Sequence, residues 1–132
     1  MRKYNFFLIT SIIIFLIGCV GPYPARITNN ASERESQILI YDWHLRGNLA
    51  VAGFKKMKLG NGLLTVNLQL KNQTDETLKV QVKIKFKDKQ NFFIEESKWK
   101  LVVILPHEIN TVGCYSHSSE AVDFAADIRN YQ

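Results

Sequence analysis

The segment from Leu78 to Lys87 alternates strictly between apolar and polar side chains, and it constrains the fold more than any other part of the sequence. Apolar residues occupy every second position, and the positions between them hold Lys79, Gln81, Lys83, Lys85 and Lys87. A period of two residues is typical of a β-strand with one buried face and one solvated face. A register slip of one residue would bury the lysines, so we expect the pairing of this strand to be firmly fixed.

Similar segments recur from Gln37 onward, separated by turn residues. Residues 64–71 alternate in the same way, and Gly60-Asn61-Gly62, 72–75 and 88–91 are turn signals. Further strands are expected at 38–43, 49–54, 92–94, 99–105, 109–115 and 124–129. Because turn signals at intervals of roughly ten residues are typical of antiparallel sandwiches, the sequence predicts an all-β domain with an antiparallel sandwich of about seven strands.

Two of these segments depart from simple alternation between buried and exposed residues. Apolar residues occupy both faces of 99–105, with Val102 and Ile104 opposite Trp99, Leu101, Val103 and Leu105. We therefore expect this strand to be buried on both sides. The stretch 119–128 contains three alanines and could form a short helix, although we favour a strand.

The N-terminal residues have the pattern of a targeting signal. Arg2 and Lys3 precede an apolar run from Phe6 to Ile17, which is shorter than the roughly 20 residues of a membrane-spanning helix and fits a secretory signal peptide. The run ends in Leu16-Ile17-Gly18-Cys19, which resembles the bacterial lipobox. That resemblance implies cleavage before Cys19 and lipidation of its thiol, and two or more acyl chains anchor a protein stably. The alternative is an ordinary signal peptide or anchor in which the cysteine is incidental.

The mature chain would begin with Cys19, and the next residue is Val20 rather than the Asp that favours inner-membrane retention in enterobacterial-type sorting. We therefore expect a lipid-anchored protein of the bacterial cell envelope, in the outer membrane and facing the periplasm. Prolines and small polar residues follow as far as residue 36, which is typical of a flexible tether. The sequence thus divides into a signal peptide (1–18), an acylated cysteine with its tether (19–36) and a β domain (37–132).

Three features together resemble the YcfL-type family of small periplasmic lipoproteins. They are the lipobox, the strand pair 63–72 and 78–88, and a distal stretch with Pro106, Glu108, Ala121, Phe124 and Arg129. In the family the first strand ends in Asn and the second in aromatic residues and Asp, positions that Asn72 and Phe86-Lys87-Asp88 occupy here. The chain departs from the family in having one aromatic residue before the Asp and no glycine soon after it. The resemblance covers about residues 38–130 and implies an immunoglobulin-like β-sandwich on a lipid anchor, without any catalytic or binding residue.

Two clusters could carry chemistry, and for both we favour a structural interpretation. Cys114 and His117 could supply two metal ligands, but a structural zinc site needs four and Cys19 would be acylated. A Ser/His/Asp hydrolase site could be drawn from Ser116, His117, Ser118 and Asp123, but nothing resembles a nucleophile elbow or an oxyanion motif. We expect Cys114 to be at least partly buried and His117 to lie in a loop. The sequence predicts no enzyme activity, no metal site and no cofactor.

The lysine row of the first strand is the remaining candidate site. Lys79, Lys83, Lys85 and Lys87 share one face of 78–87 and would span roughly 26 Å. Such a row could bind anionic lipid, lipopolysaccharide or an acidic partner, or it could simply keep an exposed strand soluble. Nucleic acid is not expected, because the compartment is wrong and no aromatic residues are interleaved with the lysines.

The function that these patterns favour is a non-enzymatic protein-interaction or adaptor module. It would bind another envelope protein through its sandwich surface or by adding a strand at an edge. The alternative is a protein that binds anionic glycolipid or polysaccharide through the lysine row. The sequence leaves the oligomeric state open.

Overall fold

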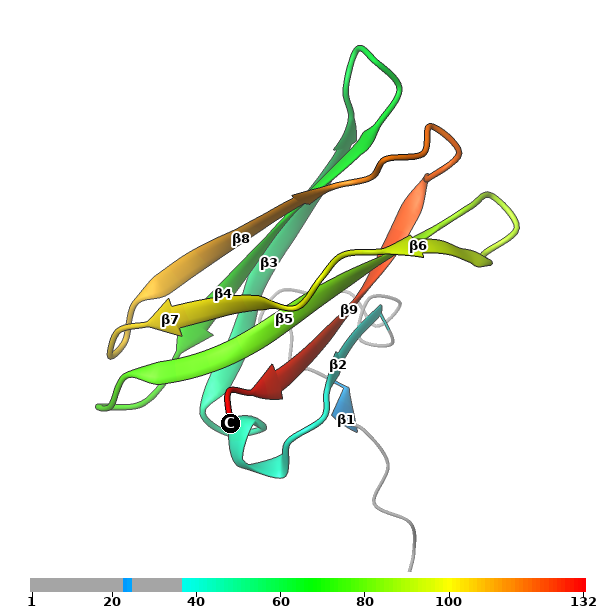
Figure 1. Ribbon diagram of the computed structural model, residues 1–132. Coiled ribbons are helices and arrows are strands. Elements are labelled where there is room, and N and C mark those ends of the chain that lie inside the picture. The colour runs from blue at the N-terminus through cyan, green and yellow to red at the C-terminus, as the bar shows by residue number, and fades with distance from the viewer. Residues whose placement is uncertain (1–22, 25–36) are drawn as a thin grey trace, which may run out of the picture.

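The computed structural model describes residues 23–24 and 37–132, which form two β-sheets packed face to face (Figure 1). The larger sheet has the order β1 (Tyr23–Pro24), β2 (Ile38–Ile40), β9 (Asp123–Asn130), β5 (Leu78–Lys87) and β6 (Phe93–Glu96), and β7 (Lys100–Ile104) also pairs with β5. The smaller sheet has the order β3 (Leu49–Lys58), β4 (Leu64–Asn72) and β8 (Ile109–Tyr115). A single 3-10 turn, η3 (Trp43–Leu45), connects β2 to β3.

The expected all-β sandwich is confirmed. β6 and β7 pair with successive halves of β5, so they act as one interrupted strand. With these two counted together and the two-residue β1 left aside, the described part of the sandwich has seven strands, in agreement with the expected number of about seven. Most neighbours are antiparallel, but β2 runs parallel to β9, with Ile38 opposite Ala126. This pairing joins the first and last strands of the domain and was not expected from local patterns.

The alternating strands build the core as their periodicity predicts. In β5 the inward residues Val80, Val82, Ile84 and Phe86 are at most 2% exposed, and they face Leu64, Val66, Leu68 and Leu70 of β4, which are similarly buried. Burying one such side chain fully stabilises the fold by about 1.5–3 kcal/mol. The polar residues of β5 point away from this core, so the expected register of the strand is confirmed.

Two local expectations are wrong. Leu101 and Val103 of β7 are 51% and 42% exposed, because β7 lies at the edge of the larger sheet and only its other face meets the smaller sheet. Trp43 does not extend β2 but lies in η3, where it is 66% exposed. The segment 119–128, by contrast, contains the start of β9, so the strand interpretation is confirmed and the helix is wrong.

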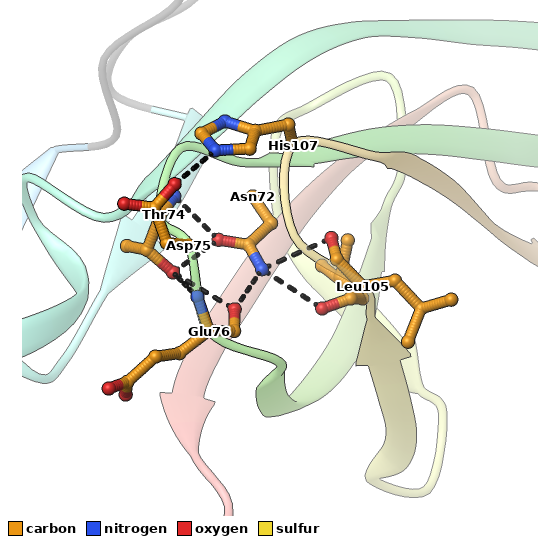
Figure 2. A network of polar contacts seen from close by, with 7 residues as sticks. Asn72, Thr74, Asp75, Glu76, Leu105 and His107 are labelled. Carbon is orange, nitrogen blue, oxygen red and sulfur yellow. Dashed lines mark hydrogen bonds and ion pairs between the residues drawn. The ribbon is translucent and has the colours of Figure 1, made fainter.

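A buried amide fastens two of the turns that cross between the sheets. Asn72 ends β4 and is fully buried. Its amide nitrogen donates to the carbonyl oxygens of Glu76, Ile104 and Leu105 at 2.6, 3.0 and 3.1 Å (Figure 2). Its amide oxygen accepts from the backbone N–H and the hydroxyl of Thr74 at 2.9 and 2.8 Å. One side chain therefore holds the β4–β5 turn against the β7–β8 turn.

Asp88 has a comparable role at the other end of β5. Its Oδ1 accepts from the backbone N–H groups of Gln90 and Phe92, both at 2.9 Å, which closes the turn between β5 and β6. Asn72 and Asp88 are two of the polar positions that carry the family resemblance. Both side chains form hydrogen bonds that stabilise turns, so the resemblance at these two positions reflects the fold.

The free edge of the smaller sheet at β3 carries inward-pointing charges. Lys56 and Lys58 occupy positions opposite the core residues Val66 and Leu64 of β4. Lys56 Nζ lies 2.7 Å from Asp123 Oδ1, and Lys58 Nζ donates to the carbonyl oxygen of Ser119 at 2.6 Å. Inward charges on an edge strand disfavour pairing with a strand of another molecule.

The adjacent edges at β7 and β8 have side chains bonded to their backbone. Lys100 Nζ donates to the carbonyl oxygen of Gly113 at 2.6 Å, and Asn110 Nδ2 donates to that of Val103 at 2.9 Å. A new strand would have to displace these donors. The edges at β3, β7 and β8 are therefore poorly suited to strand addition.

Candidate functional site

The outer face of the larger sheet, which points away from the core, carries the predicted lysine row. Lys83 Nζ lies 2.9 Å from Glu96 Oε1 on the neighbouring β6. Lys87 Nζ lies 5.0 Å from the centroid of the Phe93 ring. Lys79 is exposed and makes no ion pair with any described residue. The row therefore lies on one face, as expected, but part of its charge is balanced within the sheet.

Lys85 forms the most buried ion pair of this face. Its Nζ lies 2.6 Å from Oδ2 of Asp127, whose side chain is 7% exposed. The hydrogen bond with Asp127 raises the pKa of Lys85, and burial opposes this effect. The other carboxylate oxygen, Oδ1, is buried and has no hydrogen-bond partner within the described part of the chain. A buried acceptor without a donor costs about 1–3 kcal/mol, so it calls for a structural or functional explanation.

Three exposed apolar residues, Leu101, Val103 and Leu105, form a stripe along the edge of the same face. They are 51%, 42% and 50% exposed. Val103 lies opposite Lys79 and Leu101 lies opposite Gln81, so this apolar stripe borders polar residues of β5. Contiguous exposed apolar groups with a polar rim are typical of interaction surfaces.

A hollow of about 570 Å³ opens where β9 ends, beside the apolar stripe. Tyr41, Gln81, Trp99, Asp127 and Arg129 are among its lining residues. The guanidinium carbon of Arg129 lies 4.1 Å from the centroid of the Trp99 ring, and its Nε donates to Gln81 Oε1 at 2.9 Å. Such cation–π contacts contribute about 0.5–1 kcal/mol at exposed sites. The stack places the Arg129 guanidinium against the Trp99 ring at the wall of the hollow.

Asp123 at the start of β9 belongs to a separate polar cluster. Its Oδ1 accepts from Lys56 Nζ at 2.7 Å and from Gln37 Nε2 at 2.8 Å. Burial alone would raise the pKa of Asp123, but the hydrogen bonds from Lys56, the backbone N–H of Phe124 and Gln37 hold it below the ordinary value of 3.8. This cluster ties β3 and the residue before β2 to β9.

The sequence contains two clusters that could carry chemistry, a metal-binding pair and a hydrolase site. Their residues Cys114, Ser116 and His117 are located as follows. Cys114 is 8% exposed on the inner face of β8, which confirms its expected burial. Ser116 is fully buried, and its hydroxyl accepts from the backbone N–H of Leu64 at 2.8 Å and donates to the carbonyl oxygen of Ser118 at 2.9 Å. His117 is exposed in the loop after β8. Residues 23–24 and 37–132 contain no group of three or more His, Cys, Asp or Glu that could hold a metal ion.

Cys19 and the predicted signal peptide lie outside the described residues, as does most of the predicted tether. Tyr23 and Pro24 within that tether form β1 and pair with β2. None of the helices in the described part of the chain has the length and apolar character needed to cross a membrane.

A family model described as "Protein of unknown function (DUF1425)" matches residues 36–130. The chain belongs to the DUF1425 family. A comparison with curated proteins gave no match.

Two solved structures are similar to this DUF1425 domain. One is the Campylobacter jejuni protein cj0090, with 18% identity and a TM-score of 0.61 over 72% of this chain and 98% of that chain. The other is a DUF1425 family member from Shewanella sp. pv-4, with 16% identity and a TM-score of 0.58 over 64% of this chain and 79% of that chain. At these identities the similarity concerns the fold alone.

Sequence reasoning found the lysines of the DUF1425 domain but missed the hollow. Its lining residues come from β5, β9 and the segments before η3 and β7, and only the register of the sheet brings them together. One sequence signal could have pointed to the hollow. In the strand expected at 124–129, the carboxylate Asp127 shares the outward face with Ala125 and Arg129.

Proposed function

We propose that this DUF1425 protein is a non-enzymatic, lipid-anchored protein of the bacterial cell envelope, of the YcfL type, that binds another envelope protein. The sequence Leu16-Ile17-Gly18-Cys19 supports the lipid anchor, and Val20 supports an outer-membrane location facing the periplasm. The partner binds the outer face of the larger sheet, at the apolar stripe.

The exposure of the apolar stripe is the observation that carries this proposal. Leu101 and Val103 of β7 and Leu105 directly after it are about half exposed, where they could bury apolar area against a partner. Lys79, which has no ion pair in the described chain, borders the stripe. The face thus fits a partner with an apolar centre and carboxylates at its rim. Strand addition at β3, β7 or β8 is less favoured, because inward charges and side-chain donors protect these three edges.

The test is affinity capture from detergent-solubilised envelopes, read by mass spectrometry. The acylated wild type is compared with a Leu101→Ser, Val103→Ser double variant. Ile109→Ser is the matched control, because Ile109 is 53% exposed but lies on β8 of the smaller sheet. We expect the double variant to lose a defined set of proteins that the wild type and the control both retain. Equal recovery by all three forms would contradict binding at the stripe.

A Cys19→Ser form tests the anchor separately. It keeps the domain and removes the proposed acylation site. Loss of the protein from the membrane fraction supports lipidation at this residue. Unchanged membrane association would contradict it.

Binding of anionic glycolipid or polysaccharide by the lysine row is the second candidate function. Lys79 and Lys87 favour it, since neither makes an ion pair with a described residue. The test is a Lys79→Gln, Lys87→Gln variant, which leaves Lys85 in place because its removal would leave a buried carboxylate unpaired. A Lys55→Gln, Lys71→Gln variant removes the same charge from the smaller sheet. Only the first variant should lose salt-sensitive binding to anionic vesicles, and equal losses would contradict a specific row.

A further inference from the structure

The pairing of β1 determines which end of the sandwich lies nearest to Cys19. β1 pairs with β2 so that Tyr23 lies opposite Ile40, and η3 begins three residues after Ile40. Because the pairing is antiparallel, Tyr23 is the residue of β1 nearer to η3 (Figure 1). Tyr23 is only the fourth residue after Cys19, and a chain of that length spans at most about 14 Å. A lipid on Cys19 would therefore hold the η3 end of the sandwich close to the membrane surface.

Exposed aromatic residues gather at this same end. Trp43 in η3 is 66% exposed, Tyr41 just before η3 is 47% exposed, and Tyr131 is 46% exposed. The backbone N–H of Tyr41 donates to the carbonyl oxygen of Ile128 at 2.9 Å, and the C-terminus that follows β9 lies next to η3 (Figure 1). Tryptophan and tyrosine are the side chains enriched at the interface between membrane and water, since each has an apolar ring and a polar atom.

The turn η3 holds Trp43 in a fixed position. Leu45 of the same turn is 2% exposed and belongs to the core. The backbone N–H of Leu45 donates to the carbonyl oxygen of Asp42, and that of Arg46 donates to the carbonyl oxygen of Trp43, both at 3.1 Å. The Trp43 ring contacts the His44 ring, with 3.6 Å between centroids, yet most of the residue stays exposed. The indole can therefore enter a headgroup layer without any opening of the core.

The charges at the η3 end are of both signs. Arg46 is exposed there, and so is Lys79, whose carbonyl oxygen accepts from the backbone N–H of Tyr131 at 3.0 Å. Asp75 and Glu76 are exposed in the β4–β5 turn, which is hydrogen-bonded to the loop after η3. Attraction and repulsion between this end and anionic headgroups therefore oppose each other. Aromatic side chains, rather than charge, would provide the contact with lipid.

The opposite end of the sandwich also has exposed aromatic residues, so exposure alone does not select an end. Phe92 and Phe93, at the β5–β6 turn, are both more than half exposed. Across the sheet, Tyr23 is level with Val82 of β5. Lys87 lies further along β5 by roughly 17 Å, and Phe92 lies beyond it. A reach of about 14 Å from Tyr23 does not extend to that turn, so the anchor selects the η3 end.

We propose that the η3 end of the sandwich lies on the surface of the lipid bilayer, with the Trp43 indole in the headgroup layer. This inference rests on the proposed lipid anchor at Cys19. It assigns a membrane contact to residues that the proposed partner surface does not use. The short reach before β1 sets the orientation of the domain, and the aromatic side chains stabilise it.

The test measures quenching of single tryptophans by lipid. The acylated protein, made from the full chain and purified from membranes, is reconstituted into phosphatidylcholine vesicles in which some lipid carries a nitroxide on its headgroup. Of the two tryptophans in the chain, Trp99→Phe leaves only Trp43. The matched control combines Trp43→Phe and Trp99→Phe with Phe92→Trp, which moves the reporter to the opposite end. Each variant is compared after circular dichroism and its unfolding midpoint show a folded domain.

We expect blue-shifted emission and strong quenching of Trp43, both unchanged at high salt, and little quenching at position 92. Equal quenching at the two positions, or stronger quenching at position 92, would overturn the proposal. Mass spectrometry of the purified protein distinguishes this failure from failure of the anchor. An unmodified Cys19 would contradict the anchor and the membrane contact together, whereas an acylated protein with unquenched Trp43 would overturn the membrane contact alone.

A longer chain before β1 tests whether the short reach orients the domain. A Gly-Ser insertion of about twelve residues after Gly21 adds up to about 40 Å of reach. The same insertion after Asn30 follows β1 and leaves the chain between Cys19 and Tyr23 unchanged. Only the first insertion should reduce the quenching of Trp43. Equal quenching in the two proteins would overturn the orienting role of β1.

Discussion

Replacing Asn72 with alanine tests whether one buried amide holds the two turns together. The change removes the hydrogen bonds to the carbonyl oxygens of Glu76, Ile104 and Leu105, and also the acceptor for Thr74. It leaves the apolar strands of the core intact. The expected result is a large loss of stability with an unchanged fold.

The size of the stability loss depends on which of these backbone and hydroxyl groups can form a hydrogen bond with water once the Asn72 amide is gone. The bond from Asn72 to Ile104 is buried, whereas those to Glu76, Leu105 and Thr74 are only partly so. Water can replace the amide at the partly buried groups, so each of them costs about 0.5–1.5 kcal/mol or less, while the dry carbonyl costs about 1–3 kcal/mol. We expect a total near 3 kcal/mol, which lowers the melting temperature by roughly 10–20 °C in a domain of this size.

The assay is urea unfolding of the purified protein, followed by tryptophan fluorescence. Asn48→Ala is the matched control, because that exposed side chain makes one bond, to the carbonyl oxygen of His44 at 2.9 Å. The control should lose no more than about 1 kcal/mol. If Asn72→Ala lost no more than the control, the network would not have the role assigned to it.

The Asn72→Asp variant tests whether a hydrogen-bond donor is required at this position. At neutral pH its carboxylate would place an acceptor against three carbonyl oxygens, so this variant should be less stable than Asn72→Ala. Protonation at low pH converts one oxygen into a donor, so the deficit relative to Asn72→Ala should shrink as the pH falls. A deficit that does not depend on pH would contradict this reasoning.

Three further outcomes are expected. Lys85→Gln should destabilise the domain by about 2 kcal/mol or more in urea unfolding, because it leaves the buried carboxylate of Asp127 unpaired. Lys83→Gln should cost less than about 1 kcal/mol, because its partner Glu96 is largely exposed, and equal losses for the two variants would contradict this reasoning. Since hydrogen bonds lower the pKa of Asp123 below 3.8, its ionisation stabilises the fold above that pH, and stability is lost as the pH falls through the lowered pKa; Asp123→Asn should flatten that part of the stability–pH profile. Cys114 should react with a thiol reagent slowly in the native protein and quickly in urea, since it is 8% exposed, and fast native labelling would show that β8 opens.

The position and facing of a strand could be predicted where one of its faces is buried and the other is exposed to solvent. β4 and β5 satisfy this condition along their whole length, so their hydrophobic period is complete. β7 does not, because its outward residues Leu101 and Val103 are apolar but exposed. Periodicity alone cannot distinguish a strand between two layers from an edge strand with an apolar outer face.

The site was predictable only in part, for a related reason. The lysines of β5 share a face because they share a strand, and local alternation is sufficient to show this. Their partners Glu96 and Asp127 come from β6 and β9, and the pairing of those strands with β5 depends on the whole sheet. The hollow depends further on the parallel β2–β9 pair, which brings Tyr41 next to Ile128 through a 2.9 Å backbone hydrogen bond.

The parallel pairing of β2 with β9 determines how the domain would respond to mechanical force. The strands run in the same direction, with Ile38 opposite Ala126 and Ile40 opposite Ile128. A pull applied at the start of β2 and at the end of β9 therefore slides the strands past one another, which strains all their backbone hydrogen bonds together rather than opening them one after another. On the proposed lipid anchor, a partner that pulls on the C-terminal strand would load this pair in shear. The unfolding rate of the sandwich under tension, rather than its equilibrium stability, would then set how long the link to the membrane lasts.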